Sequence, residues 1–536
     1  MKETTGTGTL LRLALRLDRI RATVWVLALS IFTVASSASN FDVYGTPQQR
    51  AELAASVETS PALLALGGRA FDLTTVGGVT AYQMVAFTTT LIGLMSILLV
   101  VRHTRAEEES GRVELVGSAV VGRHAWLASS LLLAVGVNLA IALLVALGLI
   151  GIGLPVTGSL AFAAGCAACG IIFALIAGVA AQLTESARAA TGIASAVLGL
   201  SYLLRAAGDA ATATADNALS VLTWLSPIGW AELLRPYTDE SWWVLLLFAA
   251  AGVALYAVMS VLAARRDIGA GVLPPRLGAP AASPALRSST ALAWRLQRGT
   301  LIGWALGFIV VGAAFGGVAQ GMVTVAGQNP DVADLIRDFG GAGSNVDNFI
   351  AAIASLMGIV IGAYAVQATL RLRGEEAEHR LDMLLSTAVE RLRWVGGHVT
   401  VAVLGTAVVL TAAGLAAGLA HGLRSGDVGG EVPRVLGATL AQAPAVWVLV
   451  GVCVLLFGLA PRYSIVGWGV LFVVLVIGQF GKILQLDQWV LNLSPFTHVP
   501  DLPAADFTAT PLLVLVLVGA ALTAVGMAGV HRRDIA

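Results

Sequence analysis

A chain of 536 residues that is 57% hydrophobic and only 12% charged has too little polar surface for a water-soluble body, because soluble proteins carry about 25% charged residues. A mean hydropathy of +0.84 indicates a multi-span membrane protein, and a formal net charge of zero gives no global field for nucleic acid. The three cysteines lie inside apolar runs, so we expect neither disulfides nor a metal site, and C-A-A-C at 166–169 is predicted to pack within a membrane helix.

Apolar runs long enough to cross a bilayer, about 17–25 residues each, recur along the chain. We predict twelve spans, at 22–40, 80–101, 126–152, 159–182, 190–206, 242–263, 300–324, 349–370, 395–420, 436–460, 464–482 and 511–530. The first span has a basic lead and a small-residue end, as a signal peptide has. A related lead, "RLQRGTLIGW", opens the internal run at 300, so both are read as retained spans.

The basic residues predict the orientation. Twelve spans with a cytoplasmic N-terminus place both termini inside, and all but eight of the 32 Lys and Arg residues fall on that side. This excess follows the positive-inside rule. We therefore expect a multi-pass protein of the bacterial plasma membrane with both termini in the cytoplasm.

Two charged stretches interrupt the apolar chain, and we call them the first cassette (Arg105–Trp126) and the second cassette (Arg373–Trp394). At an offset of 268 residues they align without a gap, with eight identities in 22 positions, where composition alone gives about two. "LSP" at 225–227 and 493–495 follows the same offset, and "RRDI" at 265–268 and 532–535 follows it within one residue. The chain is predicted to be a tandem duplication.

Each predicted half has six spans, so the two repeats run parallel in the membrane. The halves are 1–268 and 289–536, and the Pro-, Gly- and Ala-rich stretch 269–288 is a cytoplasmic linker. The expected fold is an all-α integral membrane protein of about twelve transmembrane helices in two parallel six-helix repeats.

Each cassette has the pattern of a short amphipathic helix that lies parallel to the membrane. Taken as a helix, the first cassette opens with Glu107, Glu108 and Glu109, which suit the positive end of the helix dipole. Apolar residues then share one stripe: Val113, Val116 and Val120, matched by Leu381, Leu384 and Ala388. A loop that only fixes topology needs basic residues but no repeated acid pair, so the matched charges favour a partner surface.

The stretches "EEESGRVELVGSAVVGR" and "EEAEHRLDMLLSTAVER" resemble the coupling helix of type-two ATP-binding-cassette exporter permeases, E-x-x-x-G-x-x-E-L-L-x-S-x-P-V-S-R. With "SPALLALGG" outside and "LSPIGW" before the sixth span, the chain resembles the actinobacterial polyketide-antibiotic exporter permeases of the tetronasin-resistance type. Val120 and Ala388 replace the proline of the pattern, and His379 replaces its glycine in the second copy. Equal docking of the two halves therefore does not follow.

The resemblance implies a separate nucleotide-binding ATPase, in two copies per chain, that docks on the cassettes. The implied docking residues are Arg105, Glu107, Glu108, Arg112, Glu114 and Arg123, with Arg373, Glu375, Glu376, Arg380, Asp382 and Arg391. It also implies that "LLRLALRLDRIR" at 10–21 is an interfacial connecting helix, whose arginines share one face.

The chain carries no motif for using ATP. It has no G-x-x-x-x-G-K-[S/T] phosphate loop, and "GQFGKI" at 478–483 lacks both the spacing and the hydroxyl. We expect no catalytic residue and no cofactor on this chain, with ATP and Mg²⁺ bound by the partner ATPase. The sequence also shows no Ser/His/Asp set and no His-Glu-x-x-His, so an intramembrane enzyme is disfavoured.

The rival hypothesis is an ion-coupled secondary transporter, which also uses six-plus-six repeats. Such proteins keep ionisable residues inside their spans. The predicted spans are nearly free of them, and Arg205 and Lys482 fall at outer span ends, where snorkelling explains them. The scarcity favours a driving force that enters from outside the membrane domain.

By analogy with the family, the second and fifth spans of each half line the substrate path. The implied residues are Tyr82, Gln83, Phe87, Tyr202, Tyr364, Gln367 and Phe472. A mostly apolar path with a few amides and hydroxyls suits a small lipophilic or amphiphilic cargo. An antibiotic, a lipid and a siderophore-like metabolite all remain open.

Short helices and turns are predicted on the outer side. Thr46 is placed to cap a helix that starts at Pro47, and Ser60 to cap "PALLAL". A third short helix is expected at 329–339. The prolines Pro227 and Pro495 of the two "LSP" motifs should break the backbone into re-entrant turns near an outer gate.

Together these features predict the permease subunit of an ATP-driven exporter of lipophilic or amphiphilic compounds, surrounded by membrane lipids and without a nucleic-acid partner.

Overall fold

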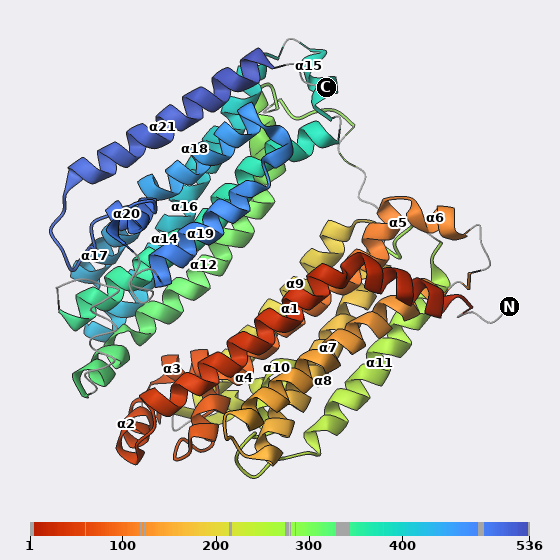
Figure 1. Ribbon diagram of the computed structural model, residues 1–536, viewed down its shortest axis with the longest axis vertical. Helices are drawn as coiled ribbons and strands as arrows, with labels where there is room; N and C mark the ends of the chain where they lie inside the picture. Colours follow the sequence, from red (N-terminus) through yellow and green to blue (C-terminus); the bar gives the residue numbers. More distant parts are fainter. Residues whose placement is uncertain are drawn as a thin grey trace. The chain divides into compact units, whose positions relative to one another are not determined.

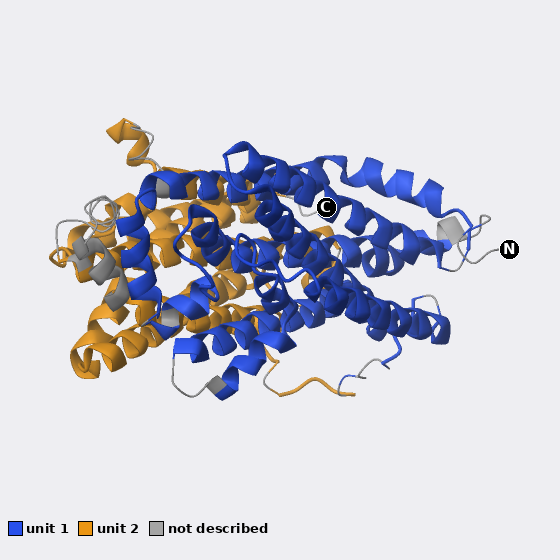
Figure 2. Cartoon of the chain, turned by 90° about the horizontal axis from the view of Figure 1, so that it is seen from below, with its two compact units in different colours: residues 1–278 blue, residues 279–536 orange. Residues whose placement is uncertain are grey.

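The computed structural model describes residues 5–533, apart from 59, 118–120, 123, 214–216, 268, 274–277, 279, 285, 329–343, 379, 388 and 481–486. The side chains of 62, 115–117, 217, 320–328, 345, 479 and 480 are likewise left out. Within the described residues all regular secondary structure is helical, as the sequence predicts (Figure 1). The chain divides into two compact units, Met1–Gly278 and Ala279–Ala536 (Figure 2).

Unit 1 is a bundle of long helices with short ones at its ends. Its helices are α1 (Thr7–Val43), α2 (Pro47–Glu58), α3 (Pro61–Gly67), α4 (Val76–Val101), α5 (Glu107–Glu109), α6 (Arg112–Gly117), α7 (Ala125–Gly151), α8 (Val156–Leu183), α9 (Ala187–Ala210), α10 (Pro227–Leu233) and α11 (Val244–Arg265). Helix α8 packs against α4, α7, α9 and α11, so it forms the centre of the unit. Cys166 and Cys169 lie fully buried on α8 with free thiols.

Unit 2 contains α12 (Ser289–Gln328), α14 (Asn345–Ala377), α15 (Arg380–Leu385), α16 (Arg391–Ser425), α17 (Val428–Leu440), α18 (Ala443–Leu459), α19 (Val466–Phe480), α20 (Gln488–Leu491) and α21 (Ala509–Arg532). Its closest helix pairs are α12 with α16 and α18 with α21. At Gly316 a side chain would collide with the backbone of Ala417 on α16. Small residues thus let these helices approach closely, as membrane helices do.

The described residues contain eleven helices that are long and apolar enough to cross a membrane, one fewer than the twelve predicted. The difference falls at the predicted span 464–482. There the structure has α19 of 15 residues, preceded by a 3-10 turn at Pro461–Tyr463. The described part of this helix is about 22 Å long, which is less than the roughly 30 Å hydrocarbon core. Lys482, which we expected at the outer end of this span, lies outside the described residues.

The predicted first span is part of a longer helix. Helix α1 runs without a break for 37 residues from Thr7, so the predicted interfacial segment 10–21 and the span form one helix. Its Asp18 is buried and contacts His103 at 2.6 Å and Arg102 at 3.1 Å, near the end of α4. The start of α1 is thereby fixed beside the first cassette.

The predicted short helices at 47 and 61 are confirmed. Thr46 Oγ1 accepts a hydrogen bond from the Gln49 N–H at 3.3 Å, and Ser60 Oγ accepts one from the Leu63 N–H at 3.4 Å. The helix predicted at 329–339 lies outside the described residues. Pro227 begins α10, which Ser226 caps, and Pro495 begins a 3-10 turn, so each "LSP" starts a new short helical segment.

Candidate functional site

The first cassette is not the single amphipathic helix that we predicted. Helix α4 continues through a π-helical turn (Arg102–Ala106) into α5, and Gly111 then reverses the backbone at φ +73° before α6 begins. Glycine adopts this left-handed conformation at little cost, so the helical run ends there. The acids Glu107–Glu109 therefore lie at the C-terminal end of a long helix and not at the start of a short one.

The second cassette has the same order of elements. Helix α14 runs on to Ala377 and carries Glu375 and Glu376 in its last turn, and the six-residue α15 begins at Arg380. Acids are unfavourable at the negative end of a helix dipole. In both units, arginines close to these acids offset that cost.

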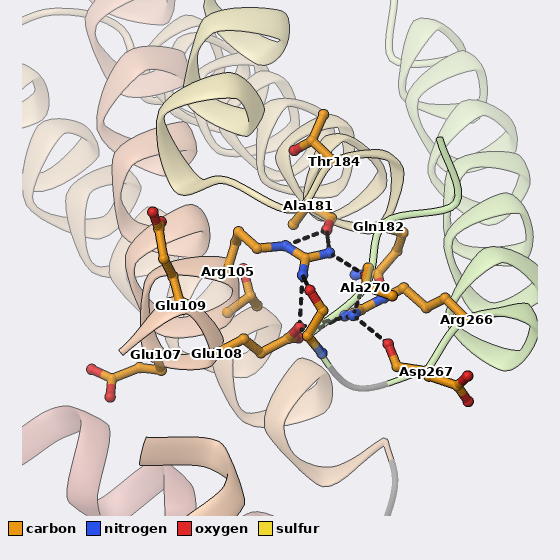
Figure 3. Close-up of polar contacts among 12 residues, drawn as sticks. Arg105, Glu107, Glu108, Glu109, Ala181, Gln182, Thr184, Arg266, Asp267 and Ala270 are labelled. Atoms are coloured by element: carbon orange, nitrogen blue, oxygen red, sulfur yellow. Dashed lines mark hydrogen bonds and ion pairs between the residues drawn. The ribbon is translucent and has the colours of Figure 1, made fainter. Parts of the chain in front are cut away.

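Arg105 is the most deeply buried charge of the first cassette, with no exposed side-chain surface. Its Nε and Nη2 donate to the carbonyl of Ala181 at 3.0 and 2.5 Å, near the end of α8 (Figure 3). Its Nη1 donates to Glu108 Oε2 at 2.9 Å, and its Nη2 also reaches the Ala270 carbonyl at 3.1 Å. Arg105 thus joins the end of α4 to the end of α8 and to the chain beyond α11.

Glu108 is held from a second direction by Arg266, the residue that follows α11. Arg266 donates from Nη2 to Oε1 at 2.6 Å and from Nη1 to Oε2 at 2.8 Å (Figure 3). Its Nε donates to Gln182 Oε1 at 2.5 Å. This two-pronged, mostly buried contact is the strong form of a charge-assisted hydrogen bond.

Glu107 and Glu109, which flank Glu108, are also engaged. Glu107 contacts Arg112 at 3.3 Å. Glu109 Oε2 accepts a hydrogen bond from the Ala187 N–H at 3.0 Å, at the first residue of α9. A carboxylate is favourable at the positive end of a helix, so Glu109 fixes the start of α9 beside the cassette.

The same ion pairs occur in unit 2 at positions 268 or 267 residues further along. Arg373 contacts Glu376 at 3.5 Å, Arg533 contacts Glu376 at 3.0 Å, and Arg380 contacts Glu375 at 3.3 Å. One difference is the burial of the first arginine, since Arg373 exposes 41% of its side chain. The carbonyl of Arg533 also accepts a hydrogen bond from Arg391 at 2.8 Å.

The predicted docking residues therefore fall into two groups. Arg105, Glu107, Glu375 and Glu376 are buried in contacts within their own unit, and Glu108 is mostly buried in such contacts.

A second group points outward on or beside the short helices α6 and α15. Arg112 exposes 66% of its side chain and Arg380 exposes 45%, and Glu114 and Asp382 are exposed as well. Met383, which we did not predict, is 69% exposed on α15. Arg123 lies outside the described residues. Among the described residues, the outward faces of α6 and α15 carry charged side chains that are accessible to a partner.

The predicted path residues also divide by exposure. Tyr82 and Tyr364 are buried, and their hydroxyls donate to the carbonyls of Leu63 and Val401. Phe87 and Phe472 are exposed on α4 and α19.

The remaining path residues are polar or aromatic groups near helix surfaces. Gln367 is exposed and accepts a hydrogen bond from Trp304 Nε1 at 2.8 Å. Gln83 and Tyr202 are half-buried, and the Tyr202 ring lies 4.5 Å from the Arg205 guanidinium. Phe87, Gln367 and Phe472 are thus the predicted path residues whose side chains are exposed.

The snorkelling predicted for Arg205 is wrong. Its side chain is fully buried, and it contacts Asp209 at 3.6 Å and Glu232 at 3.4 Å. Arg69 approaches the same Asp209 at 3.0 Å. Burial raises the pKa of the Glu232 carboxyl, and the charge of Arg205 opposes that rise. The sequence did not reveal this four-charge cluster because Arg69 and Glu232 come from segments far from α9.

Sequence reasoning also missed Arg266 and Arg533 as functional candidates. The sequence feature that could have identified them is the "RRDI" motif, which recurs at nearly the same offset as the cassettes. In the structure the second arginine of each motif is the one that meets the cassette.

Comparison with known proteins identifies relatives over nearly the whole chain. The family model described as "Multidrug efflux system permease Rv1217c, C-terminal domain" matches residues 8–263 and 286–531. The multidrug efflux system permease protein Rv1217c of Mycobacterium tuberculosis is 44% identical over 532 residues, which cover 99% of this chain and 95% of that protein.

Proposed function

The chain belongs to the Rv1217c family of multidrug efflux system permeases, and from this we propose that it is the membrane subunit of an ATP-driven exporter. A separate ATPase binds MgATP and docks on α6 and α15 from the cytoplasm. One ATPase subunit meets each cassette, and closure of the ATPase pair moves the two units so that cargo leaves the cell.

The accessible faces of the two cassettes carry this proposal. Each unit presents a six-residue helix directly after the end of a long span, with an exposed acid on it: Glu114 on α6 and Asp382 on α15. Buried ion pairs fix the chain just before each of these helices. A short helix whose preceding chain is held by ion pairs is suited to transmit the movement of a bound partner. Its displacement is passed to the long helix before it instead of being absorbed by a flexible loop.

The matching ion pairs of the two units also support the proposed duplication. Two copies of one docking element fit a partner that is itself a pair of like subunits. The faces are not identical in sequence, however, because the exposed Met383 of α15 stands where α6 has Leu115. The proposed complex therefore has one permease chain, two ATPase subunits and unequal contacts at its two docking points.

The proposed cargo is lipophilic or amphiphilic. The predicted path residues with exposed side chains are Phe87, Gln367 and Phe472. They provide two aromatic rings and one amide. Such surfaces bind apolar bodies and leave only a few polar groups to orient them.

A second candidate function, ion-coupled transport, is favoured by the cluster of Arg69, Arg205, Asp209 and Glu232. Buried ionisable groups near a membrane span often mark ion or proton pathways. This cluster removes part of the sequence argument against coupling to an ion gradient, so the energy source needs a direct test.

The test compares the two energy sources in one preparation. The tagged chain is purified from native membranes, and the co-purified protein is assayed for MgATP hydrolysis. Inverted membrane vesicles are then assayed for uptake of the dye Hoechst 33342 with MgATP, with MgATP plus vanadate, and with a proton gradient alone. We expect uptake with MgATP that vanadate abolishes. Uptake driven by the proton gradient alone would establish the second candidate.

A pair of variants tests the docking faces. Glu114→Arg with Asp382→Arg should remove the ATPase from the purified complex while membrane insertion is kept. The control is Glu185→Arg, a charge reversal at another exposed acid close to the first cassette, in the turn between α8 and α9. Undiminished ATPase binding by the double variant would contradict docking at α6 and α15.

A further inference from the structure

In each unit, the residue directly after the last long helix is an arginine that meets a cassette acid. Arg266 follows α11 and contacts Glu108 at 2.6 Å, and Arg533 follows α21 and contacts Glu376 at 3.0 Å. All four side chains are at least four-fifths buried. We call these two contacts the arginine–acid pairs.

Each pair stands close to the proposed docking helix. Glu108 is four residues before Arg112, where α6 begins, and Glu376 is four residues before Arg380, where α15 begins. Because the backbone between acid and docking helix is so short, a displacement of α6 or α15 reaches the acid directly.

Beyond the acid, each pair leads into the rest of its unit. In unit 1, Arg266 also binds Gln182 near the end of α8. In unit 2, Arg533 lies 4.7 Å from the Phe457 ring on α18, and its carbonyl is bound by Arg391 at the start of α16. Each arginine therefore connects the cassette to its own helix and to a third helix end.

We infer that Arg266 and Arg533 are positioning residues that transmit movement of the docking helices to α11 and α21. This inference rests on the proposed function, since it requires an ATPase to move those helices. The arginines touch neither ATP nor cargo. Without them, the ATPase would bind and hydrolyse ATP, but less of its movement would reach the last span.

The simpler explanation is that these arginines only fix the orientation of the chain in the membrane. The neighbouring residues distinguish the two. Arg265 and Arg532 carry the same charge at the same helix ends, yet they are exposed and form no ion pair with any residue that the structure describes. A role in topology is shared by all four arginines, whereas a role in transmission belongs to Arg266 and Arg533 alone.

The experiment measures dye transported per ATP hydrolysed in inverted vesicles that contain the complete complex, with Hoechst 33342 as the dye. We expect Arg266→Gln with Arg533→Gln to lower this ratio about tenfold or more while ATPase co-purification stays unchanged. The control, Arg265→Gln with Arg532→Gln, should keep the ratio of the unaltered protein. A variant that merely folds less well would lower the amount of complex and leave the ratio alone.

Charge exchange provides a second measurement. In unit 2, Glu376→Arg alone and Arg533→Glu alone should each lower the ratio. The two together should restore part of it, because the pair is reformed with reversed sign while Arg373 loses its acid partner. An unchanged ratio in Arg266→Gln with Arg533→Gln, or an equal loss in the control, would overturn the inference and leave the proposed function intact. Absence of any ATPase from the unaltered complex would overturn the proposed function, and the inference with it.

Discussion

Arg105 and Arg373 occupy matching positions in the two cassettes but differ in burial, and this difference predicts unequal effects of one substitution. Arg105→Met keeps most of the side-chain volume and removes the guanidinium. The Ala181 carbonyl then loses two donated hydrogen bonds, and Glu108 loses one of its two arginines. A buried group left without its partner costs about 1–3 kcal/mol, and breaking a buried ion pair costs about 3–5 kcal/mol.

Because Glu108 keeps its contact with Arg266, we expect Arg105→Met to lower the free energy of unfolding by about 3 kcal/mol, the lower end of the range for a broken buried ion pair. Arg373→Met removes one contact of 3.5 Å from a side chain that is 41% exposed. Exposed pairs contribute about 0–1 kcal/mol, and Glu376 keeps Arg533. The expected difference between the two variants is therefore about 2 kcal/mol or more.

The assay is thermal unfolding of the purified chain in detergent, followed by the fraction that remains monodisperse on size-exclusion chromatography. In a unit of this size, about 3 kcal/mol corresponds to a fall in melting temperature of about 6–12 °C. Arg105→Lys should fall between the variant and the unaltered protein, since lysine keeps the charge but not the fork of donors. Equal melting temperatures for Arg105→Met and Arg373→Met would refute the reasoning.

Two further predictions concern the backbone of the cassette and the buried charge cluster. Gly111→Ala should destabilise the protein by about 1 kcal/mol, because Gly111 has φ +73°, with open space around it. Gly374→Ala, inside α14, should be neutral or should stabilise the protein by up to about 1 kcal/mol. Equal melting-temperature shifts for the two variants would contradict this prediction. Arg205→Met should destabilise by about 3–5 kcal/mol, and adding Glu232→Gln should recover part of the loss because it removes one unpaired carboxylate; a double variant no more stable than Arg205→Met would show that the two side chains are not coupled.

Hydropathy and capping residues predicted much of the helical framework. Long apolar runs located eleven of the predicted spans, because a membrane helix needs continuous apolar length and little else. Thr46 and Ser60 were recognisable as helix caps because a cap depends on residues three positions apart. Features fixed by local sequence were therefore predictable.

The cassette geometry was less predictable because its partners are distant. The acids Glu107–Glu109 suited the start of a helix. Arginines bind Glu107 and Glu108, and the start of α9 binds Glu109, and these distant partners explain why the acids stand at the end of a helix. Arg266 lies 158 residues from Glu108 along the chain, and Glu232 comes to Arg205 from another helix. A single sequence lists these charges but not which of them meet.

The two cassettes show how matched sequence leads to different structure. Arg105 and Glu108 are identical to Arg373 and Glu376 at the 268-residue offset, and both arginines contact the acid three residues later. Arg105 is nevertheless buried, because the carbonyls that bind it belong to Ala181 and Ala270, outside the matched stretch. Pairs inside a cassette follow from its sequence, whereas burial depends on what the rest of the unit brings to it. An arginine that binds its own unit is not available to a partner, so the two cassettes are expected to meet the proposed ATPase with different sets of side chains.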